Sequence, residues 1–211
     1  MRANSLLNYL FSGRASSLLY YSHKAEYYEL NNTISSLLTL YQTLSILDDY
    51  KDCDRIEIPF LPNGIKLGSN SANVISKLGK AKYSLSKDVG IGHTILFYRQ
   101  NISRINILSQ IHLYNDIVVY VRVSFDYLEA SKGAKKSIYQ SLKSKYDLVI
   151  DENNDNYYID ENNNYLKVFD NGQISVQFFY VNKDTLEEIR KNIPDSASKK
   201  GNSEDLIKDL I

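Results

Sequence analysis

Apolar residues recur every three or four positions near the start of the chain, separated by Ser, Thr and Gln. They are Ile34, Leu37, Leu38, Tyr41, Leu44 and Leu47. This spacing predicts one amphipathic helix, for which Asn32 is a suitable N-cap. A stretch over 16–30 has a looser helical pattern. We therefore expect residues 1–52 to form a helical N-terminal region.

From Asp54 onward the apolar period changes from helical to alternating. The segments rich in β-branched and aromatic residues are Ile56–Phe60, Ile95–Arg99, Ile105–Leu113, Ile117–Phe125, Tyr157–Ile159, Tyr165–Phe169 and Ile174–Val181, and each predicts a strand. Two helices are expected between them, over about 71–78 and 133–146. A last short helix should end before Pro194, because proline stops helices.

The apolar pattern also selects a register for the first hairpin. Ile111 and its alternating neighbours share a face with Val121 and its neighbours only if the loop has three residues, 114–116. This register gives the opposite face of the sheet three cross-strand pairs, which are His112 with Val118, Gln110 with Tyr120, and Leu108 with Arg122.

The second hairpin is predicted from its turn residues. Asn171-Gly172 is typical of a two-residue type I′ turn, which pairs Phe169 with Ile174. The two faces then differ in composition. Tyr165, Phe169, Ile174, Val176 and Phe178 fall on one face, and Leu166, Val168 and Phe179 fall on the other.

These elements predict an α+β protein with three regions. A helical extension over 1–52 precedes an α+β domain over 53–193, and a polar, mobile tail follows over 194–211. The domain is expected to hold an antiparallel sheet with helices packed on one face. The order helix then strands occurs twice, which suggests tandem units.

Charge and cysteine content exclude several classes of function. Lys and Arg number 25 and so do Asp and Glu, so no net positive field draws the chain to nucleic acid. Cys53 is the single cysteine, which excludes an internal disulfide and a multi-thiolate metal site. No segment approaches the length of a membrane span. Met1-Arg2 and the short apolar run after it lack a cleavage site, so we expect a cytoplasmic rather than an exported protein.

No catalytic or metal-binding motif is apparent. His23, His93 and His112 lack the spacing of metal ligands. Asp151, Asn153 and Asp155 alternate like calcium ligands, but the glycine and the final glutamate of that motif are missing, so an Asx-rich loop is the better interpretation. We predict no catalytic residues, no metal and no cofactor. The alternative is a hydrolase-like enzyme with a site assembled around His93 or His112.

Residues 65–81 carry the most specific pattern in the chain. The matching positions are Gly68, Val74, Leu78 and Gly79, with Asn70 at a helix cap where Ser or Thr is usual and Ala81 where Pro is usual. This segment resembles the SmpA/BamE lipoproteins and the related β-lactamase-inhibitor-protein-like modules. The resemblance implies a helical layer on an antiparallel sheet whose other face, or its loops, engages a partner protein. The family's lipid-accepting cysteine is absent.

These observations together favour a non-catalytic module that binds another protein, such as a toxin-neutralising immunity protein or an envelope-assembly factor. The predicted binding face consists of Leu108, Gln110, His112, Tyr120, Arg122, Leu166, Val168 and Phe179. Tyr and Arg dominate the energetics of many interfaces. Two alternatives stay open. The 34–47 helix could cover this face and make it interior, or the N-terminal helix could drive self-association.

Overall fold

The computed structural model places most of the chain and divides it into two compact units. The described residues are 24–49, 53–56, 61, 64–86, 89–102, 105–126 and 132–194. The first unit ends at Thr33 and the second begins at Ile34. In the first unit a helix spans 24–30, where Asn31 Nδ2 donates to Tyr27 O at 2.8 Å. Residues 195–211 of the tail predicted over 194–211 lie outside the described residues, as do the predicted strand residues 57–60.

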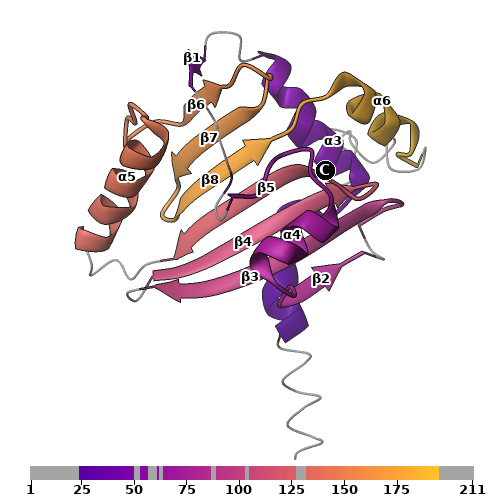
Figure 1. Ribbon diagram of the computed structural model, residues 1–211, viewed down its shortest axis with the longest axis horizontal. Coiled ribbons are helices and arrows are strands. Elements are labelled where there is room, and N and C mark those ends of the chain that lie inside the picture. The colour runs from indigo at the N-terminus through magenta and orange to yellow at the C-terminus, as the bar shows by residue number, and fades with distance from the viewer. Residues whose placement is uncertain are drawn as a thin grey trace, which may run out of the picture. The chain divides into compact units, whose positions relative to one another are not determined.

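An eight-stranded sheet forms the second unit, in the order β1-β6-β7-β8-β5-β4-β3-β2 (Figure 1). The strands are β1 (Asp54–Arg55), β2 (Tyr83–Leu85), β3 (His93–Ile102), β4 (Ile105–Tyr114), β5 (Ile117–Asp126), β6 (Asn156–Ile159), β7 (Tyr165–Asp170) and β8 (Ile174–Phe179). The one parallel pair among them is β1 with β6. The sheet is therefore mixed but mostly antiparallel, and the α+β class is confirmed.

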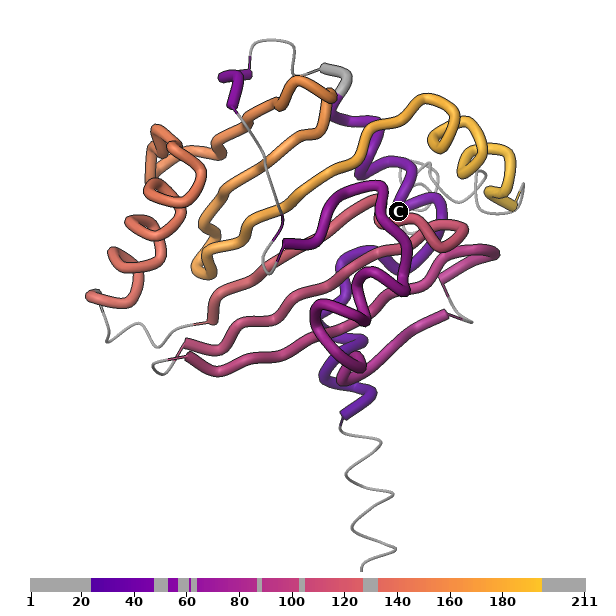
Figure 2. The backbone as a smooth tube through the Cα atoms, viewed as in Figure 1, coloured from indigo at the N-terminus to yellow at the C-terminus, as the bar shows by residue number. Residues whose placement is uncertain are grey.

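Helices lie on both faces of this sheet, where the sequence predicts them on one. They are α3 (Leu37–Ser45), continued by a 3₁₀ turn over Ile46–Asp49, α4 (Ser71–Leu78), α5 (Lys132–Tyr146) and α6 (Lys183–Lys191). One apolar layer joins α3 and α6 to the sheet through Leu40, Leu44 and Ile189. The other joins α4 and α5 through Val74, Ile138 and similar residues. Figure 2 traces the chain through both layers.

The apolar stripe over 34–47 is buried on the sheet, so the compact unit starts at Ile34 and not at residue 53. Its helix begins later than predicted, because Ser36 is the N-cap in place of Asn32. The Ser36 Oγ accepts a hydrogen bond from Thr39 N at 3.1 Å. The helix predicted over 71–78 is found as expected, with Asn70 as its cap and Gly79 after its last turn at φ 75°.

The predicted register of the first hairpin is wrong along its whole length, and none of the three predicted cross-strand pairs is found. Tyr114 pairs with Ile117 around a two-residue turn, in which Asn115 and Asp116 both have positive φ. The register then shifts between His112 and Leu113, since β5 contributes one extra residue there. This bulge returns Ile111 and Val121 to one face. The cross-strand pairs become His112 with Tyr120, Gln110 with Arg122, and Leu108 with Ser124.

The predicted register of the second hairpin is also wrong. Asp170 pairs with Ile174, so the loop has three residues and Phe169 lies opposite Ser175. Asp170 Oδ1 accepts a hydrogen bond from Gly172 N at 3.0 Å, which stabilises a loop one residue longer than that of a type I′ turn. Leu166 and Val168 therefore share a face with Val176 and Phe178, and Tyr165 and Phe169 lie on the other.

The order helix then strands does occur twice. α4 precedes β2 to β5, α5 precedes β6 to β8, and the two sets of strands join through the pairing of β5 with β8. Both helices lie on the same face of the sheet, α4 near β3 and β4 and α5 beside the β6 to β8 strands (Figure 1).

Candidate functional site

A cavity of about 320 Å³ lies on the face of the sheet that carries α4 and α5. The helix α4 is short and buries a single residue completely, Val74. The longer α5 packs on the far side, where the Tyr146 ring lies 6.0 Å from that of Phe178. Neither helix covers the middle of β3, β4 and β5 on this face, so the uncovered part of the sheet becomes the cavity floor.

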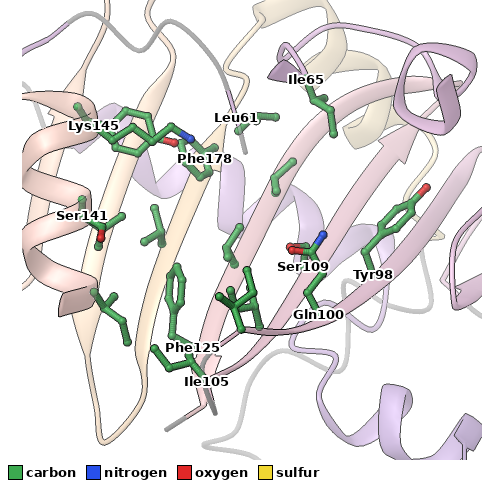
Figure 3. Close-up of a pocket in the computed structure, with 18 of the residues that line it drawn as sticks. Leu61, Ile65, Tyr98, Gln100, Ile105, Ser109, Phe125, Ser141, Lys145 and Phe178 are labelled. Atoms are coloured by element: carbon green, nitrogen blue, oxygen red, sulfur yellow. The ribbon is translucent and has the colours of Figure 1, made fainter. Parts of the chain in front are cut away.

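Most of the cavity wall is apolar. Its aliphatic and aromatic lining consists of Leu61, Ile65, Leu78, Ile102, Ile105, Ile107, Ile111, Val121, Val123, Phe125, Ile138, Leu142, Tyr146, Val176 and Phe178. The lining also includes Tyr98, Gln100 and Ser109 from β3 and β4, and Ser137, Ser141 and Lys145 from α5. Figure 3 shows Lys145 and Ser141 on one side and Tyr98 and Gln100 on the other, with Phe178 near Lys145.

Several of these polar groups are already engaged within the protein. The hydroxyls of Ser137 and Ser141 donate to carbonyls of their own helix, each at 2.8 Å. Tyr98 OH donates to Gly79 O at 3.0 Å, which ties the end of α4 to β3. Burial raises the pKa of Tyr98. The cavity is therefore more apolar than its residue types alone suggest.

Lys145 is the one charged side chain among the described residues of this lining. Its Nζ lies 4.9 Å from the centre of the Tyr146 ring, and its apolar surroundings lower the pKa of its ammonium group. Two other lysines of α5 have acidic partners, since Lys135 lies 2.8 Å from Asp170 and Lys143 lies 3.9 Å from Glu152. Within the described part of the chain, Lys145 has none.

The predicted binding face is mostly interior. Leu108, Gln110, His112, Tyr120, Arg122 and Phe179 lie on the same face as α3, and all but the half-buried Arg122 are buried. Leu166 and Val168 lie on the opposite face, buried beneath α5. The arrangement corresponds to the alternative in which the 34–47 helix covers the face.

Two histidines that are distant in sequence meet in this interior. His93 Nδ1 lies 3.2 Å from Val89 O, and His93 Nε2 lies 3.2 Å from His112 Nδ1. Because a carbonyl oxygen only accepts, His93 carries its proton on Nδ1, and its Nε2 accepts from His112 Nδ1. The proton-free Nε2 of His112 is then buried without a hydrogen-bond partner. Burial lowers the pKa of His93 to about 4 and that of His112 well below its usual value.

This pair lies apart from the cavity, and the described lining residues include neither histidine nor carboxylate. The enzyme alternative expects a histidine and a carboxylate to converge in a concave site. Among the described residues the cavity offers no such pair. No group of three or more metal-ligating side chains occurs in that part of the chain either.

The carboxylates of the Asx-rich loops accept hydrogen bonds from within their own loops, as the sequence indicates. Asp151 accepts hydrogen bonds from Asn153 N at 2.9 Å and from Asn154 Nδ2 at 2.7 Å. Asp160 accepts from Asn162 N at 2.8 Å and from Asn164 N at 2.7 Å. These carboxylates stabilise tight turns and are occupied by their own loops.

The cavity residues were missed by sequence reasoning, although a local clue exists. Ser109 stands between Ile107 and Ile111 on an apolar strand face, and Ser137 and Ser141 flank Ile138 on a helix that packs on the sheet. Small residues at such positions leave space where larger side chains would fill the core.

Comparison of the chain with protein-family models, with curated proteins and with solved structures finds no match. The resemblance of residues 65–81 to the SmpA/BamE and inhibitor-protein-like modules thus stays a prediction. Across the described residues, no helix combines the length and the apolar character needed to cross a membrane.

Proposed function

We propose that this protein binds an apolar small molecule in the cavity between α4 and α5, without transforming it. The observation that carries the proposal is a cavity of about 320 Å³ with a largely apolar wall. Voids in protein interiors rarely exceed the size of one water molecule, which occupies about 30 Å³ in the liquid. A volume of about 320 Å³ lies at the lower end of the range of small-molecule sites, roughly 300 to 1,000 Å³.

Solvent access supports this proposal. Ile102, which lines the cavity, is 53% exposed, and Ser141 and Lys145 are exposed as well. A ligand can therefore enter without unfolding of the sheet. The absence of an acid–base pair among the described lining residues favours binding over catalysis.

The test is titration with a neutral fluorescent alkyl probe. The probe should bind the unaltered protein with a one-to-one stoichiometry. Ser109→Trp should abolish binding, since the indole would occupy the space above β4. Ser144→Trp is the matched control, because Ser144 is exposed on α5 and does not line the cavity.

Circular dichroism of both variants confirms that the sheet still forms. Probe binding that is equally strong in Ser109→Trp and in the unaltered protein would place the probe elsewhere and contradict the proposal.

A partner protein is the second candidate, and exposed apolar side chains on this face favour it. Ile75 on α4 is 49% exposed, one turn before Leu78 of the cavity lining, and Ile102 is 53% exposed. A partner could cover both residues. Binding of the neighbouring gene's product that is weakened by Ile75→Asp but unaffected by Ser109→Trp would favour this candidate over the small molecule.

A further inference from the structure

The charge distribution around the cavity is asymmetric. Of its lining residues, Lys145 alone is charged, and no aspartate or glutamate stands in the described lining to repel an anion. The rest of the wall is aliphatic and aromatic, apart from hydroxyls and one amide. The site therefore combines a long apolar surface with a single positive charge at its mouth.

The helix dipole offers one explanation for the position of Lys145. Lys145 lies in the last turn of α5, where the helix dipole favours a cation. Lys143, in the same turn, serves that role equally well and is paired with Glu152. The helix dipole does not account for the lack of an acidic partner at Lys145, or for its position against the apolar lining.

The environment of the ammonium group provides a second observation. The side chain is exposed, but the neighbouring apolar side chains and the Tyr146 ring remove part of the water around the ammonium group, and its pKa is lowered for that reason. A cation that loses water without gaining a counter-ion is destabilised, and an anion beside it would offset that cost. Figure 3 shows the Lys145 amine next to Phe178, directed toward the cavity.

We infer that the ligand is a single-chain amphiphile with one negative charge, whose aliphatic chain fills the cavity and whose carboxylate pairs with Lys145. This inference rests on the proposed function and names its ligand class. The single cation matches a monoanion, since the described lining offers no second positive group for a doubly charged head.

The experiment compares three ligands that share one aliphatic chain, each tested below its micelle concentration. Decanoate carries a negative head, decan-1-ol a neutral head, and decyltrimethylammonium a positive head. The affinity of each ligand is measured by its displacement of the neutral fluorescent probe from the unaltered protein. We expect decanoate to bind roughly threefold to tenfold more tightly than decan-1-ol, the range for a partly exposed ion pair, with the cation weakest.

Three variants assign the preference to its residue. Lys145→Met should remove the preference, so that decanoate binds this variant no more tightly than decan-1-ol does, and Lys145→Arg should retain it. Lys143→Met is the matched control, because Lys143 belongs to the same turn but does not line the cavity. The preference should survive in that control and shrink at high salt.

The outcomes separate this inference from the proposed function. Equal affinity for decanoate and decan-1-ol, or a preference that persists in Lys145→Met, would overturn the inference and leave the apolar site standing. If none of the three ligands displaces the probe, or the probe itself does not bind, the proposed function fails, and the inference fails with it.

Discussion

The buried pair of His93 and His112 should make the fold sensitive to mild acid. Both imidazoles are neutral in the folded protein, because burial lowers their pKa values, that of His93 to about 4. In the unfolded chain each has its ordinary pKa of 6.5. Above pH 6.5 both histidines are neutral in the folded and in the unfolded state, so they do not lower the free energy of unfolding there. Below pH 6.5 the unfolded chain binds protons first, and stability falls.

The size of this loss follows from proton linkage. Each histidine that stays neutral in the fold costs about 1.4 kcal/mol per pH unit below its unfolded pKa. At pH 5 this amounts to roughly 2 kcal/mol for His93, and to roughly 4 kcal/mol if His112 behaves likewise. Carboxylates whose pKa values are lowered in the fold, such as Asp151, act at lower pH and do not contribute in this window.

Urea denaturation followed by circular dichroism at pH 7.5 and pH 5 measures this effect. With a urea dependence of about 2 kcal/mol per molar, the midpoint should fall by roughly 1 to 2 M between the two pH values. His93→Gln and His112→Gln should each reduce the shift, and the double variant should lose this component. His23 is present in every variant, so its contribution to the midpoint shift is the same in all of them. A double variant as acid-sensitive as the unaltered protein would refute the reasoning.

Two further predictions test the layer beneath α3. Tyr120→Ala should lower the melting temperature by several degrees, because removal of a buried aromatic side chain costs about 3 to 5 kcal/mol. An unchanged melting temperature in a calorimetric scan would show that this face is not interior. Gly90→Ala should be at least about 1 kcal/mol more destabilising in urea than Gly172→Ala. Both glycines have positive φ, but a Cβ at Gly90 would lie 2.5 Å from Leu37 Cγ, whereas one at Gly172 meets nothing; equal losses would indicate that backbone strain alone decides.

Local signals predict the helices and strands of this fold well. The helix over 71–78 has its cap and its terminal glycine within ten residues of sequence, and the alternation in 105–113 marks a strand directly. The register of the first hairpin failed where local information is absent. Residues 117–121 are all apolar, since β5 is covered on both faces, so alternation could not reveal the extra residue that forms the bulge.

The cavity depends on distances that no local pattern contains. It exists because α4 and α5 lie apart on one face of the sheet. Leu78 of α4 and Lys145 of α5 line it, together with strand residues between them. The charge of Lys145 is visible in the sequence, but its lack of an acidic partner is a property of the folded chain. Sequence reasoning therefore found the elements and missed the site.

The shortness of the edge strand β2 bears on whether another chain could extend this sheet. β2 pairs with only three residues of β3, at 95–97, so residues 99–102 of that ten-residue strand have no partner strand on this side in the described structure. Arg99, Gln100 and Asn101 occupy that stretch and are exposed. A strand edge with charged and amide side chains is a poor template for another chain to extend. Replacement of these side chains by valine would turn the same edge into a site where copies add strand to strand and grow into fibrils.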